Sequence, residues 1–262
     1  MYPELFWSFT VGFMDIWICL LIVGVGFVAG FINTLAGSGS LLTLPLLIFL
    51  GLPANVANAT NRVGVILQSL VAVGGFKQKK VFEWNEGIWL TIPAVIGSFI
   101  GAAFAVNLDD QLMNRLIGFL LVFMFFLMLY KPEKWIKSKE KPVSARPSVI
   151  QVIIFLGIGF YGGFIQAGVG FFLLAGLVLG AGYDLVKANA LKALMVFAFT
   201  FVALGVFIYN GQVNYKYGII LGVGNMLGAW VATNIAIKRG AEFIRWFLLG
   251  TVLVFGVKLL FF

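Results

Sequence analysis

Two cations within apolar segments are the residues of this chain best placed to do chemistry. Arg62 lies eight residues beyond Ala54, which begins one apolar segment, and Lys192 lies seven beyond Leu185, which begins another. At the helical rise per residue, each side chain starts roughly 10 to 12 Å along its segment. A cation at that depth in hydrocarbon costs at least about 2.5 kcal/mol, so it normally faces a protein interior or a pathway. Neither segment contains an acid, so the pair predicts an anionic ligand.

The same cations also have a structural interpretation, because each could reach the membrane interface or pair with the carbonyl end of a helix. Polar residues lie on the same predicted helix face as each cation, at helical spacing. They are Asn58, Asn61, Gln68 and Ser69 around Arg62, and Asn189 and Thr200 around Lys192. Such a stripe cannot face lipid cheaply, which favours a pathway. It could instead join helices through hydrogen bonds.

A glycine-rich break precedes each of these segments. The first is GFVAGFINTLAGSGSLL, from Gly26 to Leu42, and the second is GFYGGFIQAGVGFFL, from Gly159 to Leu173. The apolar stretches that follow, 41–50 and 169–181, fall short of the ~20 residues that a spanning helix needs. We expect half-helices or re-entrant arms whose free N–H groups point at the break. Two such ends meeting near the midplane of the membrane would suit a small anion.

The predicted substrate site therefore combines both breaks with both polar stripes. Its members are Asn33, Gly37, Ser38, Gly39, Ser40, Asn58, Asn61, Arg62, Gln166, Gly168, Gly170, Asn189 and Lys192. Ser40 is a candidate cap for the first half-helix. The break glycines could instead allow close helix packing, and we expect packing for the GxxxG pairs Gly26/Gly30 and Gly159/Gly163.

Composition places these motifs in an all-α polytopic membrane protein. Of 262 residues, 61% are hydrophobic and 11% are charged, against about a quarter charged in soluble domains. The apolar segments are roughly 16–35, 41–50, 54–76, 88–106, 112–130, 149–165, 169–181, 185–209, 218–237 and 243–262. Basic residues gather near 77–80, 131–146 and 238–245. The positive-inside rule puts these three loops in the cytoplasm, so we expect a multi-pass protein of the cytoplasmic membrane.

The segments divide into two copies of one pattern. The first glycines recur 133 positions later, and after a two-residue deletion the offset is 131. The later matches include Ala57-Asn58-Ala59 with Ala188-Asn189-Ala190, and Gly97 with Gly228. Each copy holds five segments, and an odd number should invert the second copy in the membrane. We predict two inverted five-segment repeats with broken or re-entrant helices, 1–130 and 148–262, joined by a basic proline-containing cytoplasmic linker, 131–147.

The residue inventory excludes most other functions. Histidine is absent and Cys19 is the single cysteine, so no internal disulfide is possible. The chain lacks an HExxH motif, a P-loop, a buried acid pair and a metal-ligand cluster, so we expect no enzyme, cofactor or metal site. The net charge of +8 lies in loops, which indicates membrane topology rather than a nucleic-acid partner. The expected partners are the lipid bilayer and a small anionic substrate.

The pattern GFxxGFxxxxAGSGSLLTLPLLIFLGLPANVANATNRVG resembles the sulfite exporter TauE/SafE family of membrane transporters. A second stretch, GGFIQAGVGFFLLAGLVLGAGYDLVKANALKAL, is similar to the same family's repeat. The resemblance extends from about Val23 to the C-terminus, although the family often has a run of glycines where this chain has GSGS. It implies transport of a small sulfur-containing or organic anion such as sulfite, sulfoacetate or thiosulfate.

We therefore expect a secondary transporter that binds its anion between the repeats and works by alternating access. H⁺ and Na⁺ both remain candidates for a coupling ion. A passive anion channel and a structural membrane subunit are the alternatives. The direction of transport, the exact substrate and the oligomeric state stay open.

Overall fold

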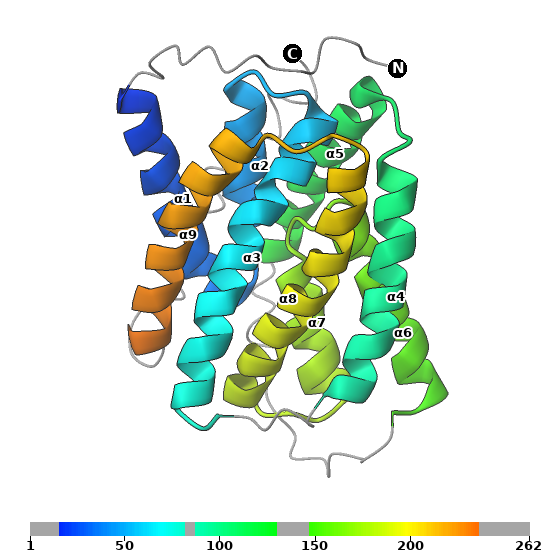
Figure 1. The fold of residues 1–262 in the computed structure, drawn as a ribbon. Helices are drawn as coiled ribbons and strands as arrows, with labels where there is room; N and C mark the ends of the chain where they lie inside the picture. Colours follow the sequence, from blue (N-terminus) through cyan, green and yellow to red (C-terminus); the bar gives the residue numbers. More distant parts are fainter. Residues whose placement is uncertain (1–15, 82–86, 130–146, 236–262) are drawn as a thin grey trace.

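A computed structural model of the chain describes residues 16–81, 87–129 and 147–235. These residues form a helical bundle without strands (Figure 1). The α-helices are α1 (Ile16–Ala36), α2 (Ser40–Phe49), α3 (Ala54–Gln78), α4 (Ile88–Ala105), α5 (Asp110–Leu129), α6 (Val149–Phe164), α7 (Val169–Ala175), α8 (Leu185–Tyr209) and α9 (Tyr215–Ile235). A π-helix, η2 (Gly176–Gly180), continues α7. The predicted last segment, 243–262, and nearly all of the predicted linker lie outside the described residues.

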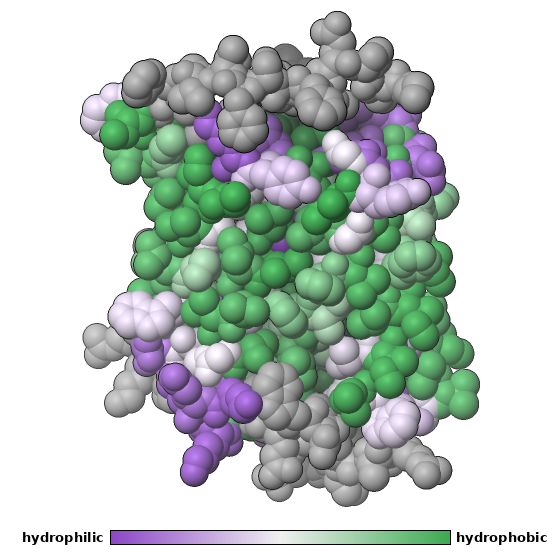
Figure 2. Space-filling model, viewed as in Figure 1, coloured by the Kyte–Doolittle hydropathy of each residue, from purple (hydrophilic) through white to green (hydrophobic). Residues whose placement is uncertain are grey.

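Several helices have the length and apolar character that a membrane span requires. By these two criteria α1, α3, α4, α5 and α8 are candidate spans. Figure 2 shows a broad hydrophobic band across the visible face, with hydrophilic residues gathered toward its two ends. Large apolar side chains such as Phe119, Phe201 and Trp230 are exposed on the outside of the bundle, as lipid contact would require. The all-α, multi-pass prediction is confirmed.

Both predicted half-helices are present as short helices inside the bundle. The first is α2, and the second is α7 with its π-helical continuation. In Figure 1, α1 starts at the upper end and α2 returns toward it, whereas α6 starts at the lower end and α7 returns there. The two hairpins therefore enter the bundle from opposite ends. Opposite entry is a feature that two inverted repeats would share, and the inverted repeat itself stays a prediction.

Glycines allow the two hairpins to pack closely on α9 and α4. α1 packs against α9, and α6 packs against α4. A Cβ added to Gly30 would lie 2.2 Å from the Asn225 carbonyl oxygen, and one added to Gly163 would lie 1.9 Å from that of Ser98. Both positions therefore accept glycine alone. The packing role predicted for the GxxxG pairs is confirmed.

The same contacts refine the repeat in one respect. Gly228 lies against the Phe27 carbonyl oxygen as Gly101, rather than Gly97, lies against that of Phe160. The shift arises because the connection from α3 to α4, residues 79–87, is four residues longer than the connection from α8 to α9, residues 210–214. Four residues correspond to about one turn of an α-helix. The offset of 131 thus describes α3 and α8 well, and it fails for α4 and α9.

We expect Gly101→Ala to destabilise the fold and Gly205→Ala to leave it as stable or more so. The added methyl of Gly101→Ala would sit 2.0 Å from the Phe160 carbonyl oxygen, while nothing lies within 4 Å at Gly205. Overpacking costs about 1–3 kcal/mol, whereas alanine in an open helical position gains up to about 1 kcal/mol over glycine. Thermal unfolding of the purified protein in detergent measures both effects. Equal unfolding temperatures for the two variants would contradict the packing interpretation.

Candidate functional site

The two glycine-rich breaks touch each other inside the bundle. The Gly170 N–H donates to the Gly37 carbonyl oxygen at 3.2 Å. A Cβ added to either glycine would lie 2.4 Å from the Cα of the other. Gly37 also has a φ of +77°, in the left-handed region that L side chains rarely adopt. Two segments that are far apart in sequence therefore form a single junction, which we call the break junction.

Arg62 projects from α3 onto the carbonyl end of α6. Its Nη1 donates to Gly162 O at 2.9 Å, and its Nη2 donates to Gly163 O at 2.6 Å and to Phe164 O at 3.3 Å. Asn58, one helical turn earlier, donates from Nδ2 to Phe164 O at 2.7 Å. These oxygens belong to the last turn of α6, where helical carbonyls have no N–H partner within their own helix. Arg62 and Asn58 together cap the C-terminal end of α6.

Lys192 makes the corresponding contacts from α8 to the end of α1. Its Nζ donates to Asn33 O at 3.1 Å, to Thr34 O at 3.0 Å and to the side-chain oxygen of Asn189. Asn189 in turn donates from Nδ2 to Leu35 O at 3.0 Å. The cation and amide of each half thus cap the broken helix of the other half.

These bonds correct the interpretation of the two cations. The sequence predicted an anionic ligand because neither segment contains an acid, and it left pairing with helix carbonyls as the alternative; in the structure both cations bind helix carbonyls. Pattern analysis could not choose between the two, because every residue carries a carbonyl and only the fold determines which ones are left free. A helix C-terminus carries roughly half a negative charge, so it offsets only part of the positive charge of the cation that caps it. Among the described residues, Arg62 and Lys192 are the buried charged side chains, 0% and 2% exposed.

The predicted helix N-termini need a smaller correction. α2 begins at Ser40 with Gly39 as the N-cap residue, so Ser40 is inside the helix and does not cap it. α7 begins at Val169, the first residue of the predicted segment 169–181, because the left-handed Gly168 (φ +71°) makes the turn before it. Gly170 therefore lies in the first turn of α7, against the other break.

Several predicted site residues connect helices within their own half. Asn61 donates from Nδ2 to Ser40 Oγ at 3.2 Å and also accepts from the Thr43 hydroxyl, which ties α3 to α2. A Cβ at Gly39 would lie 2.1 Å from Ala29 O, so this glycine serves packing. The buried hydroxyl of Ser38 has no hydrogen-bond partner among the described residues.

The amides just before the breaks are equivalent in the two halves. Asn33 donates from Nδ2 to Gln68 Oε1 at 3.1 Å, and Gln166 donates from Nε2 to Thr200 Oγ1 at 2.6 Å. Each bond ties a break to the long helix of its own half. Gln166, with φ +69°, is one of the rare non-glycine residues in the left-handed region. The local constraint at each break is therefore polar as well as steric.

A small cavity with both polar and apolar lining residues lies at the break junction. Its volume is about 10 Å³, which is room for about one water molecule. Its lining contains residues of both breaks and both long helices, namely Asn33, Thr34, Gly37, Gln68, Ser69, Ala72, Gly170, Lys192, Ala193 and Val196. Thr34, Gln68 and Ser69 were missing from the predicted site, although the last two belong to the predicted polar stripe. Of the predicted site residues, Asn33, Gly37, Gly170 and Lys192 line this cavity.

The chain matches the family model described as Sulfite exporter TauE/SafE over residues 22–259. The chain belongs to this family. A probable membrane transporter protein of Haemophilus influenzae is 30% identical, over 88% of this chain and 91% of the relative. Probable membrane transporter protein ORF9 of a Sinorhizobium species is 28% identical, over 89% of each chain. Probable membrane transporter protein YfcA of Escherichia coli is 28% identical, over 90% of this chain and 87% of the relative. No solved structure matches the chain.

Family membership makes the chain a multi-pass membrane transporter of the TauE/SafE type rather than an enzyme. Within the described residues, no cluster of acidic or cysteine side chains could hold a metal ion. The chemistry available at the break junction in this TauE/SafE protein is therefore binding by cations, amides, hydroxyls and backbone groups.

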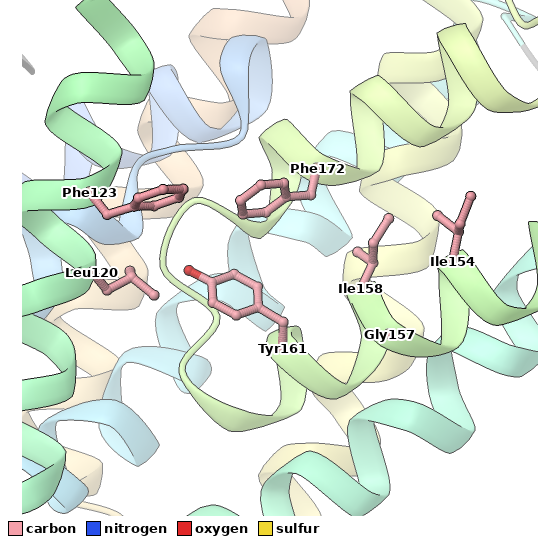
Figure 3. A pocket seen from close by; sticks show the side chains of 7 residues that line it. All are labelled: Leu120, Phe123, Ile154, Gly157, Ile158, Tyr161 and Phe172. Atoms are coloured by element: carbon pink, nitrogen blue, oxygen red, sulfur yellow. The ribbon is translucent and has the colours of Figure 1, made fainter.

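Neither Arg62 nor Lys192 lines a larger hollow in this TauE/SafE protein. It measures about 440 Å³ and is lined by Leu120, Phe123, Ile154, Gly157, Ile158, Tyr161 and Phe172. In Figure 3 these side chains come from α5, α6 and α7, and the Tyr161 hydroxyl points toward the loop of the second break. That hydroxyl already donates to Ala167 O. An apolar lining with one occupied hydroxyl suits hydrocarbon rather than an anion.

We expect Gly37→Ala to destabilise this protein more than Gly51→Ala does. Both glycines have left-handed φ, +77° and +91°, but nothing lies within 4 Å of a Cβ at Gly51. The left-handed backbone alone costs roughly 1–2 kcal/mol, and the clash of Gly37→Ala with Gly170 adds about 1–3 kcal/mol. Thermal unfolding of both purified variants separates backbone strain from contact. Equal losses would mean that the fold does not depend on contact between the breaks.

Proposed function

We propose that this TauE/SafE transporter binds a small anion at the break junction and moves it across the cytoplasmic membrane by alternating access. One observation carries the proposal. Two buried cations, Arg62 and Lys192, each hold the carbonyl end of the broken helix from the other half. Among the described residues these two are the buried charged side chains, and the helix ends that they hold lead into the break junction, where the two hairpins meet.

Electrostatics supports an anion at this position. Two helix C-termini offset roughly half a charge each, so about one unit of positive charge remains unbalanced at the junction. In a medium of low dielectric constant this residual charge attracts an anion far more strongly than it would in water. Amides and hydroxyls from Asn33, Gln68 and Ser69 line the same cavity. They would supply hydrogen bonds to the oxygens of an oxyanion.

The substrate proposed is a small sulfur-containing or organic anion such as sulfite, sulfoacetate or thiosulfate. Support comes from the description of the family as sulfite exporters and from the positive junction. No cofactor is proposed. A coupling ion, if one is used, would be H⁺ or Na⁺.

Alternating access is proposed because the cavity in this structure has room for about one water molecule. An anion would enter only after a hairpin moves. Since α1/α2 and α6/α7 enter from opposite ends (Figure 1), movement of one hairpin would open the junction to one side of the membrane and movement of the other to the opposite side. The bonds of Lys192 and Arg62 to the ends of α1 and α6 would then open in turn.

Flux in proteoliposomes tests this proposal. The panel contains radiolabelled sulfite, sulfate, thiosulfate, sulfoacetate, acetate and phosphate. We expect saturable flux of at least one anion, reduced tenfold or more by Arg62→Leu and by Lys192→Leu, because each removes a buried charge. The matched controls are Arg115→Leu and Lys216→Leu, which remove exposed charges and should leave flux unchanged.

Folding is monitored by thermal unfolding, because leucine at either position also leaves helix carbonyls without donors. Arg62→Lys and Lys192→Arg, which keep the charge, should retain more flux than the leucine variants. Stimulation by a counter-gradient of unlabelled anion would support a carrier, whereas unsaturable flux would indicate a passive channel. Full flux in well-folded Arg62→Leu and Lys192→Leu would overturn the anion site.

Labelling of single cysteines tests the proposed orientation in the membrane, in which the three basic loops face the cytoplasm. Asn107 follows α4 and Lys80 follows α3, at opposite ends of the bundle (Figure 1). In a Cys19→Ser background, we expect Asn107→Cys to react with an impermeant maleimide in intact cells. Lys80→Cys, next to Lys77 and Lys79, should react only after lysis. The reverse pattern would invert the proposed orientation of the whole chain.

A further inference from the structure

The two buried cations have different surroundings. Lys192 lines the cavity at the break junction, together with Asn33, Gln68 and Ser69. Arg62 is absent from that lining. Its guanidinium lies against the last carbonyls of α6, and its Cζ is 4.7 Å from the centre of the Phe207 ring. The pseudo-equivalent caps therefore differ in their access to the space where a ligand would sit.

Aromatic residues explain this difference. Phe199 stands 131 positions after Gln68, so the second half has a phenyl ring where the first half has an amide. The ring is fully buried and lies 2.9 Å from the position that a Cβ on Gly162 would occupy. Phe207, also fully buried, covers Arg62. Phenyl rings therefore pack against Arg62 and its acceptor residue Gly162, whereas the cavity beside Lys192 has side-chain amides and hydroxyls in its lining.

We infer that the anion binds on one side of the junction, against the Lys192 ammonium and the Ser69 hydroxyl between α1, α3 and α8, and that Arg62 positions α6 without touching it. This inference rests on the proposed anion transport, and it specifies which of the two cations contacts the bound anion. Arg62 is then a positioning residue, and Lys192 and Ser69 are binding residues.

Binding at Lys192 would also change the hold on α1. The acceptors around Nζ are Asn33 O, Thr34 O and the Asn189 side chain, which match the three N–H groups of an ammonium. An anion that takes one N–H must displace one of these acceptors. When the displaced acceptor is Asn33 O or Thr34 O, the end of α1 is released. Substrate binding is thereby linked to movement of the α1/α2 hairpin rather than to α6.

A single ammonium also sets the preferred charge of the ligand. One carboxylate or sulfonate group would be balanced by Lys192 and by neutral donors. A divalent anion would leave a second charge buried without a partner, which is strongly unfavourable in a low-dielectric interior. The class expected is a small monovalent oxyanion, so singly protonated sulfite fits among the proposed substrates and the divalent sulfoacetate and thiosulfate do not. Acetate, methanesulfonate and singly protonated sulfite serve as probes, and sulfate is the divalent comparison.

Transport kinetics in proteoliposomes test this inference, with the best-transported monovalent probe as substrate. Ser69→Ala should raise KM about tenfold, because a hydrogen bond to a charged ligand is lost. The comparison variant is Thr200→Ala, which removes the hydroxyl 131 positions later and with it the acceptor of Gln166. It should lower stability and the maximal rate but leave KM unchanged. Arg62→Lys should lower the maximal rate with KM unchanged, and Lys192→Met should abolish saturable flux. Sulfate should compete at least tenfold less well than methanesulfonate.

The outcomes distinguish this inference from the proposal beneath it. An equal rise of KM in Ser69→Ala and Thr200→Ala, or a raised KM in Arg62→Lys, would overturn one-sided binding while anion transport stands. Equal competition by sulfate, or flux of divalent anions alone, would overturn the charge preference. If the wild-type protein transports no anion of either panel, the proposed function fails and the inference fails with it.

Discussion

The capping of each broken helix by a buried cation from the opposite half is the interaction on which the rest of the structure depends. A helix that ends inside an apolar bundle leaves carbonyl groups without partners, and each unpaired group is costly where water is absent. Arg62 and Lys192 supply the missing donors at the ends of α6 and α1. In return, the helix ends provide partial negative charge to two cations that would otherwise be expensive to bury. The two halves therefore stabilise each other at their least regular points.

The same kind of contact recurs where the spanning helices end. Gln212 donates to Val106 O beyond the end of α4, and Lys79 donates to Thr233 O near the end of α9. In both cases the donor comes from the other half of the chain. Interlocking of this kind holds the helix ends in register, while the glycine contacts of α1 with α9 and of α6 with α4 set the spacing between helices. These contacts hold the two hairpins together at the break junction, and the proposed mechanism would release one hairpin at a time.

Near-symmetry of the two halves makes their differences informative. Matching amides, Asn58 and Asn189, accompany the two cations, so capping is common to both ends. Gln68 and Phe199, in contrast, make one side of the junction polar and the other apolar. Capping explains why two cations are present, and the polar side explains how one of them could also meet a ligand.

The sequence alone determined the all-helical membrane class, the two breaks, the short helices after them and the burial of both cations. These features follow from the type and spacing of side chains, because a helix presents its side chains to the protein interior or to the lipid with a fixed period. The sequence did not determine which carbonyls Arg62 and Lys192 bind, or that Gly37 meets Gly170. Nor did it show that α4 and α9 depart from the 131-residue spacing of the repeat by about one turn. It also left Thr34 out of the cavity lining. These features depend on backbone groups, which are the same in every residue, and on connection lengths, so only the tertiary structure decided them.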